Sequence, residues 1–262
     1  MVISRKVQIR LNVFFVTVAI LVILFFSMYE LGYLDELFIV LAKDNYIFYW
    51  MMLVGFLAEI VAGSMGMGYG VICTTTLLFL NIPPHIVSAS IHSAESFTTA
   101  AGSISHVKLK NVSKNLVKKL AIPAVAGAII GALCLTYLGE YYSKITKTII
   151  AFYTLYLGFQ ILSNAFKKKQ SKSLKRKTNL TRLGLIGGFI DSFAGGGWGP
   201  LVTGTLIKNS FTPRFAVGSS TVAKFILTLT AAVTFFFTLG IQHWNIILGL
   251  LLGGIVTAPF SA

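Results

Sequence analysis

The sequence predicts an all-α polytopic membrane protein with inverted repeats and broken or re-entrant helices. The first observation is composition: of 262 residues, 55% are hydrophobic and 11% are charged, whereas soluble domains carry about 25% charged residues. With a mean hydropathy of +0.80, a soluble domain of this size could not bury its apolar surface. The second observation is a series of apolar runs, and the third is a repeat of opposite orientation within that series.

The N-terminal segment predicts one membrane helix. Arg5, Lys6 and Arg10 precede an apolar run over 11–28, and acidic residues follow between 30 and 44. The run is longer than the apolar part of a signal peptide, and no small-residue cleavage site follows it. We therefore expect residues 1–45 to form an uncleaved helix and an outer loop. The basic residues predict that the N-terminus is cytoplasmic.

The later apolar runs predict the order of the remaining spans. They cover about 46–62, 70–80, 86–105, 120–138, 145–163, 183–208, 216–238 and 245–260. Residues 164–182 between the two halves are rich in lysine and arginine and contain no acid. Such a segment is typical of a cytoplasmic linker, and it divides the chain into 46–163 and 183–262.

Two of these segments are too short for the spans they must contain. From the order of the spans, residues 46–80 are expected to begin and end outside the cell, and residues 183–208 to begin and end inside it. Each segment must therefore cross the membrane twice, although two full spans need about 40 residues. Each segment has a glycine-rich interruption in its middle, at 62–70 and at 194–200. Glycine permits positive φ, and Pro200 suits the first turn of a new helix. We therefore expect a break within each segment.

The two halves align with opposite orientation. Residues 70–78 match residues 199–207 at an offset of 129 (199 minus 70), which also pairs Thr99 with Thr228. Inverted repeats with matching interruptions are typical of secondary transporters, whose substrate sites lie at those interruptions. The second repeat has no counterpart of the helix over 145–163, which would be missing or supplied by a neighbouring subunit of a homodimer.

The interruptions predict a site for a small anion. Helices that begin there present free N–H groups and the positive end of a dipole, which favour anions. Tight helix packing is the alternative explanation for the same glycines. The candidate substrate-binding residues are Gly68, Tyr69, Gly70, Thr74, Gly197, Trp198, Gly199, Thr203, Ser219 and Lys224.

Ionisable residues inside apolar runs are functional candidates, because a charge facing lipid is costly. Glu95 and Lys224 are equivalent in the two repeats and would face each other. We expect Lys224 to hold the anion, and Glu95 with His92, three residues away, to carry a proton. A structural ion pair is the alternative for Glu95 and Lys224. Glu59 and Asp191 either carry coupling protons or cap backbone N–H groups at the breaks.

Several other functions are not expected. No cofactor or metal site is predicted, because His92 and Glu95 have no second such pair and the two cysteines are not in a CxxC spacing. The basic residues form no nucleic-acid recognition motif. An enzyme is not expected, because no nucleophile–base pair or HExxH motif occurs. The expected partners are a small anion and membrane lipid.

In combination these motifs resemble the sulfite exporter TauE/SafE family of membrane permeases. The resemblance spans about 50–260 and rests on residues 66–70, 87–95, 106, 195–200 and 217–219. It implies a multi-pass cell-membrane protein that exports sulfite or another sulfur-containing anion. Alternating access with proton coupling would be the mechanism. The alternatives are a transporter of another solute, such as a metal ion or a carboxylate, and a non-transporting assembly protein.

Overall fold

The computed structural model describes residues 46–166, 178–209, 211–240 and 243–257. The chain divides into two units, 1–47 and 48–262, and nearly all described residues belong to the second. The expected N-terminal helix and most of the basic linker lie outside the described residues.

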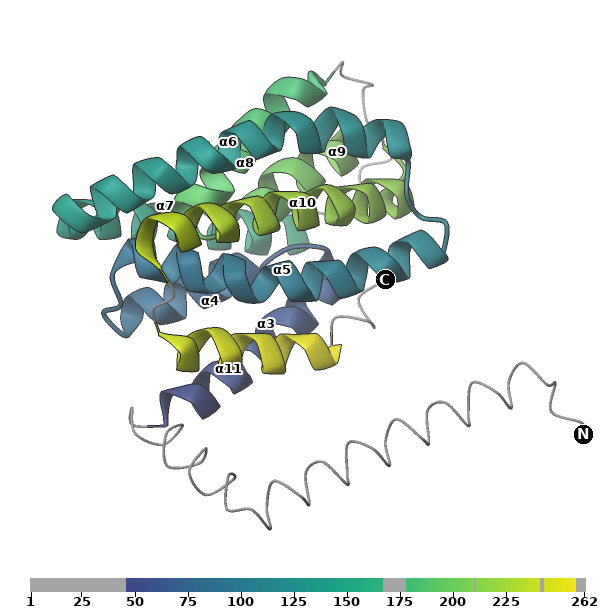
Figure 1. The fold of residues 1–262 in the computed structure, drawn as a ribbon. Coiled ribbons are helices and arrows are strands. Elements are labelled where there is room, and N and C mark those ends of the chain that lie inside the picture. Colours follow the sequence, from purple (N-terminus) through teal and green to yellow (C-terminus); the bar gives the residue numbers. More distant parts are fainter. Residues whose placement is uncertain (1–45, 167–177, 210, 241–242, 258–262) are drawn as a thin grey trace, which may run out of the picture. The chain divides into compact units, whose positions relative to one another are not determined.

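Every regular element in the described part of the chain is a helix, which confirms the predicted fold class (Figure 1). The elements are α3 (Ile47–Met65), α4 (Tyr69–Phe79), α5 (Pro84–Lys108), α6 (Lys114–Tyr141), α7 (Ser143–Phe166), α8 (Leu180–Ala194), the π-helical turn η1 (Gly199–Thr203), α9 (Gly204–Lys208), α10 (Pro213–Leu239) and α11 (Trp244–Thr257).

Three of the described helices are long and apolar enough to cross a membrane. They are α6, α10 and residues Ser143–Ser163 of α7. Helix α5 is of similar length but more polar, because it carries buried Ser88, His92 and Glu95. Polar side chains in a membrane helix normally face the protein interior, as these do.

The predicted breaks lie where glycines take positive φ. Gly66 (φ 69°) and Gly68 (φ 117°) separate α3 from α4, and Gly195 (φ 68°) ends α8. Side chains other than glycine rarely adopt this left-handed conformation. The chain therefore resumes as a new short helix after each break, at Tyr69 and at Gly199.

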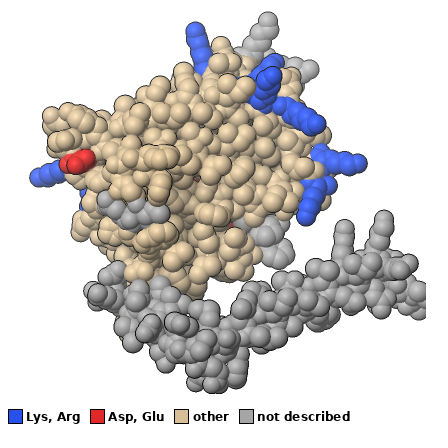
Figure 2. Space-filling view, in the orientation of Figure 1, with Lys and Arg blue, Asp and Glu red and all other residues tan. Residues whose placement is uncertain are grey.

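Most of the described basic residues lie at one end of the helices, which we call the basic end. Hydrogen bonds fix this end: Arg214 Nη2 donates to Leu109 O (2.8 Å), and Asn209 Nδ2 donates to Thr178 Oγ1 (2.6 Å). Figure 2 shows most of the visible lysine and arginine side chains there, and a smaller basic group at the opposite edge beside an acidic side chain. The basic end contains Lys108, Lys110, Lys114, Lys118, Lys119, Arg182, Lys208 and Arg214. The opposite end, which we call the outer end, contains the turn at 80–83 and Gly240, where α10 ends.

Glycines let helix backbones of the two halves approach each other closely. A Cβ on Gly188 of α8 would lie 2.9 Å from Ala124 Cα of α6, and a Cβ on Gly249 of α11 would lie 2.5 Å from Phe48 O of α3. Small residues at such contacts are typical of helix pairs in membranes. Helices α5 and α10 lie against each other, and the broken segments lie against this pair, since α5 contacts α4 and α8 while α10 contacts η1 and α9.

Candidate functional site

The two breaks lie against each other. A Cβ on Gly70 would be 2.6 Å from Gly196 Cα, and a Cβ on Gly199 would be 2.5 Å from Met67 Cβ. The offset of 129 converts the first contact into the second, since Gly70 corresponds to Gly199 and Met67 to Gly196. Reciprocal contacts of this kind are those that a two-fold axis produces. Candidate residues Gly70 and Gly199 therefore lie at the centre of the molecule.

Glu95 and Lys224 form an ion pair next to this centre. Lys224 Nζ donates to Glu95 Oε1, and the side chain of Lys224 is 16% exposed while that of Glu95 is 3% exposed. The pair joins α5 to α10 through two residues that correspond to each other at the offset of 129, as the alignment of the halves predicts. It places a partly buried cation, already neutralised by a carboxylate, within electrostatic reach of Asp191, while Glu95 lies within electrostatic reach of Tyr69 at the first break.

His92 contacts a carboxylate on another helix and not Glu95. His92 Nδ1 donates to Ser88 O (2.9 Å), and His92 Nε2 lies 3.5 Å from Asp191 Oδ2. Both residues are fully buried. Because Nδ1 donates its proton to this hydrogen bond, the Nε2 atom of a neutral His92 ring carries a lone pair, and that lone pair faces the Asp191 carboxylate. The contact is favourable only when one proton lies on His92 Nε2 or on Asp191.

Asp191 also caps the second break. Its Oδ1 atom accepts a hydrogen bond of 2.7 Å from the backbone N–H of Trp198. Of the two roles considered for Asp191, proton coupling and capping of a backbone N–H, the structure therefore contains the capping contact. The other carboxylate oxygen, Oδ2, faces His92. Glu59 on α3, the other acidic candidate close to a break, is 8% exposed and lies close enough to Glu95 and Lys224 to interact with their charges.

Hydroxyl groups at the breaks are hydrogen-bonded within the protein. Thr74 Oγ1 donates to Gly195 O (3.0 Å), which joins α4 to the second break. The Oγ1 of Thr203 and the Oγ of Ser220 are 2.6 Å apart, and Trp198 Nε1 donates to Ser220 Oγ (2.8 Å). Ser220 is not among the residues predicted from the sequence, although it directly follows Ser219.

The remaining candidates lie in different surroundings. Tyr69 is buried, and its hydroxyl donates to Leu250 O of α11 (3.4 Å). Gly68 precedes α4 in the left-handed conformation. Ser219 Oγ accepts from the N–H of Ser113 (2.8 Å), so it holds the connection between α5 and α6 at the basic end. It does not contact either break through that hydroxyl.

Several buried polar atoms near Asp191 have no hydrogen-bond partner among the described residues. Such atoms are uncommon, because burying an unpaired polar group is costly. They include His92 Nε2, Tyr153 OH, Asp191 Oδ2 and Ser192 Oγ. Tyr153, from α7, faces the second break: a Cβ on Gly197 would lie 2.5 Å from its hydroxyl. Tyr153 lies outside both breaks, and no motif marks it as a candidate in the sequence.

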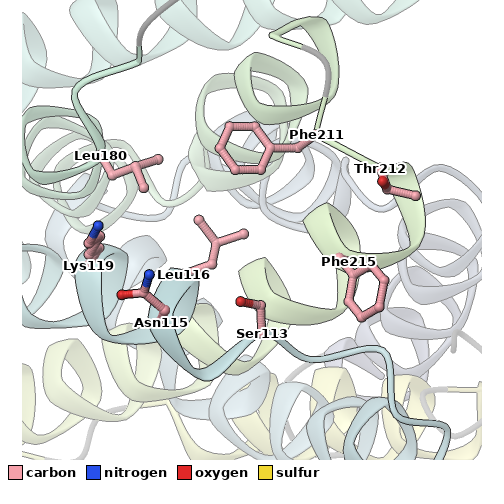
Figure 3. Close-up of a pocket in the computed structure, with 8 residues that line it drawn as sticks. All are labelled: Ser113, Asn115, Leu116, Lys119, Leu180, Phe211, Thr212 and Phe215. Carbon is pink, nitrogen blue, oxygen red and sulfur yellow. The ribbon is translucent and has the colours of Figure 1, made fainter.

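Two cavities open between the helices. The cavity at the basic end, about 530 Å³, is lined by residues of α6, α8, α10 and the loop before α10; Figure 3 shows Lys119 and Asn115 on one side and Phe211 on the other. The second, about 340 Å³, lies between α5, α10 and α11 and includes Ser90, Ser93 and Ser96. No group of three potential metal-binding side chains occurs among the residues described.

Comparison with known proteins gives the following matches. The family model described as "Sulfite exporter TauE/SafE" matches residues 51–262. The chain is 37% identical over 219 residues to the probable membrane transporter protein YtnM of Bacillus subtilis (strain 168), covering 80% of this chain and 71% of that protein. It is 27% identical over 194 residues to a probable membrane transporter protein of Haemophilus influenzae, covering 70% and 72%. No solved structure matches the chain.

Proposed function

The chain belongs to the sulfite exporter TauE/SafE family of membrane transporters, and on that premise we propose that it exports a small sulfur-containing anion, sulfite or an organosulfonate. The observation that carries the proposal is the buried cation Lys224. It pairs with Glu95 and lies within electrostatic reach of Asp191, which caps the second break. A charge held inside a membrane protein is typical of a substrate or ion pathway.

Lys224 and Glu95 act together in this proposal. A buried ammonium group needs a counter-charge, and Glu95 supplies it when no substrate is bound. An arriving anion takes the place of the carboxylate on Lys224. Glu95 then loses its partner, and a buried carboxylate without a partner favours the protonated form. Anion binding and proton uptake are thereby linked at one site.

His92 and Asp191 provide a second proton position. Their contact holds a proton only when His92 is doubly protonated or Asp191 is neutral. Because Asp191 also caps the break at Trp198, a change in its protonation alters the hydrogen bond that holds the break. Glu59, buried within the electrostatic reach of Glu95, is the remaining acidic candidate for coupling.

Alternating access follows from the proposed inverted repeats, 46–163 and 183–262. The reciprocal contacts of Gly70 with Gly196 and of Gly199 with Met67 support this division. Since positive residues favour the cytoplasmic side, we assign the basic end to the cytoplasm. The N-terminus, beginning with basic residues, is assigned to the same side.

The test is uptake of labelled sulfite, sulfoacetate and thiosulfate into inside-out vesicles, with and without a proton gradient. The comparison is between the wild type, Lys224→Ala and a control, Lys147→Ala. Lys147 also donates a hydrogen bond, to Asn81 Oδ1 (2.6 Å), but at the exposed outer end. Saturable uptake that is lost only in Lys224→Ala supports the proposal. Uptake of a metal ion or a carboxylate in place of these anions contradicts it.

A further inference from the structure

The basic end carries positive charge that no nearby acid balances. Among the residues that the structure describes, no aspartate or glutamate lies at this end. Three of the described acids, Glu59, Glu95 and Asp191, are buried in the interior, and Glu140 lies near the other end of α6. Lysine and arginine side chains near a membrane surface attract anionic lipid. The basic end is therefore complementary in charge to the headgroups of such lipids.

Lys119 lies at the level where α6 enters the hydrocarbon of the membrane. Residues 120–139, which follow it along α6, carry no charge, and about 20 helical residues span the hydrocarbon core. Lys119 is therefore at the depth of the lipid headgroups. A Cβ on Gly184 of α8 would lie 2.5 Å from Leu120 O, which places Arg182 of α8 at a similar level.

The cavity of about 530 Å³ at the basic end opens at this level. Figure 3 shows the Leu116 side chain directed toward the ring of Phe211, with Lys119 and Asn115 to one side. Both ion pairs of the described residues lie elsewhere, so Lys119 has no acidic partner among those residues. Four polar and four apolar side chains line the cavity: Ser113, Asn115, Lys119, Thr212, Leu116, Leu180, Phe211 and Phe215.

A cation among apolar walls fits a phospholipid better than a free anion. A small hydrated anion is held by polar groups, and apolar side chains add nothing to its binding. A phospholipid offers a phosphate to the ammonium group, and it offers glycerol and acyl carbons to the apolar side chains, whose burial is favourable. Basic pockets between membrane helices are typical sites for anionic headgroups.

We propose that this cavity binds the headgroup of an anionic phospholipid from the leaflet at the basic end. Lys119 pairs with the phosphate, and Asn115 and Thr212 donate hydrogen bonds to headgroup oxygens. Leu116 and Phe211 pack against the glycerol and the first acyl carbons. The inference goes beyond the proposed function, because it does not depend on which solute the chain carries.

The test is the binding of a fluorescent phosphatidylglycerol to the full chain in detergent, measured by anisotropy at high ionic strength, where exposed charges are screened. A phosphatidylcholine with the same fluorophore is the comparison lipid. Lys119→Gln removes the cation that lines the cavity, and Lys118→Gln removes its exposed neighbour, which does not line it. Asn115→Trp fills the cavity without a change in charge, and Thr212→Trp replaces it if that variant does not fold.

We expect saturable binding of phosphatidylglycerol that is at least about tenfold weaker in Lys119→Gln, because a hydrogen bond to a charged group contributes that much to affinity. Asn115→Trp should weaken binding to a similar extent. Lys118→Gln should weaken it less than about threefold, since exposed charges interact weakly and are screened. Thermal unfolding shows whether each variant is folded.

Equal losses in Lys118→Gln and Lys119→Gln, with Asn115→Trp like the wild type, would show diffuse attraction to the basic end and overturn the site. Equal affinity for the two lipids would also overturn it. Full displacement of the lipid by inorganic phosphate would indicate a site for a free anion and contradict a lipid site. None of these outcomes bears on the proposed function, because lipid binding is measured without flux.

Discussion

The Oγ1 atoms of Thr99 and Thr228 lie 3.2 Å apart where α5 crosses α10. These threonines correspond to each other in the two halves, and so do Glu95 and Lys224, which pair one helical turn away. A residue can contact its own counterpart only close to the axis that relates the two halves. The ion pair therefore lies close to the axis that relates the two halves, where each half contributes one of its two charges.

The first prediction separates the structural role of the ion pair from its role in transport. Lys224→Ala leaves Glu95 buried without a partner, so we expect a loss of about 3–5 kcal/mol in the free energy of unfolding. The double variant Glu95→Gln/Lys224→Gln removes both charges and should be close to the wild type in stability. Thermal unfolding in detergent measures stability, and vesicle uptake measures flux.

The double variant decides between the two roles. We expect it to fold and to lose flux, because no cation remains to hold the anion. Flux at the wild-type rate would mean that Glu95 and Lys224 serve only as a structural pair. Unchanged stability of Lys224→Ala would show that the buried carboxylate does not depend on this lysine.

The second prediction concerns the reciprocal glycine contacts. Gly70→Ala pushes a methyl group against Gly196, and Gly199→Ala pushes one against Met67. We expect each to cost about 1–3 kcal/mol, because backbone atoms cannot move aside as flexible side chains can. Gly158→Ala on α7 is the matched control: no atom lies within 4 Å of its Cβ, and alanine should stabilise the helix by about 0.5–1 kcal/mol.

Chemical unfolding of the three alanine variants gives the comparison. If the two breaks contact each other as described, Gly70→Ala and Gly199→Ala lose similar amounts of stability. A large loss at Gly158→Ala, or none at the two central glycines, would contradict the packing of the breaks.

Much of the fold could be predicted from the sequence, because short-range chemistry determines it. Glycine clusters set the breaks before Tyr69 and after Ala194, and the alignment at a fixed offset brought Glu95 opposite Lys224. Both features depend on residue type and spacing along the chain, which the sequence contains directly.

The partners of His92 could not be predicted in the same way. The spacing of His92 and Glu95 indicates one face of α5, but that face meets α8 at His92 and α10 at Glu95. Which helix packs at each level depends on crossing angles, which local pattern does not encode. The same reason explains why Tyr153 and Ser220 were missed, since both act through contacts with the second break.

The third prediction distinguishes capping from proton coupling at Asp191. Asparagine keeps an oxygen that accepts from the Trp198 N–H and removes the carboxylate that faces His92. We expect Asp191→Asn to retain most of the stability and to lose the effect of a proton gradient on flux. Asp191→Ala should also lose about 1–3 kcal/mol of stability, since it leaves a buried N–H without a partner.

Uptake at two imposed gradients, together with thermal unfolding, measures both effects. Glu140→Gln is the control, because it removes an exposed carboxylate at the outer end. A gradient effect that persists in Asp191→Asn would assign coupling to Glu95 or Glu59 and leave Asp191 with a capping role alone.

The last prediction is a double-mutant cycle between Gly197 and Tyr153. Alanine at position 197 places its Cβ 2.5 Å from the Tyr153 hydroxyl, while the nearest ring carbon is 3.6 Å away and Ile190 Cγ2 is 3.1 Å away. Removing the hydroxyl in Tyr153→Phe relieves the closest contact. The stability cost of Gly197→Ala should therefore be about 1 kcal/mol or more smaller in the Tyr153→Phe background, in the range measured for residues in contact. Tyr153→Phe alone should not lower stability, since its buried hydroxyl has no partner in the described structure. If the stability losses of the two single variants simply add up in the double variant, Tyr153 of α7 does not pack against the second break.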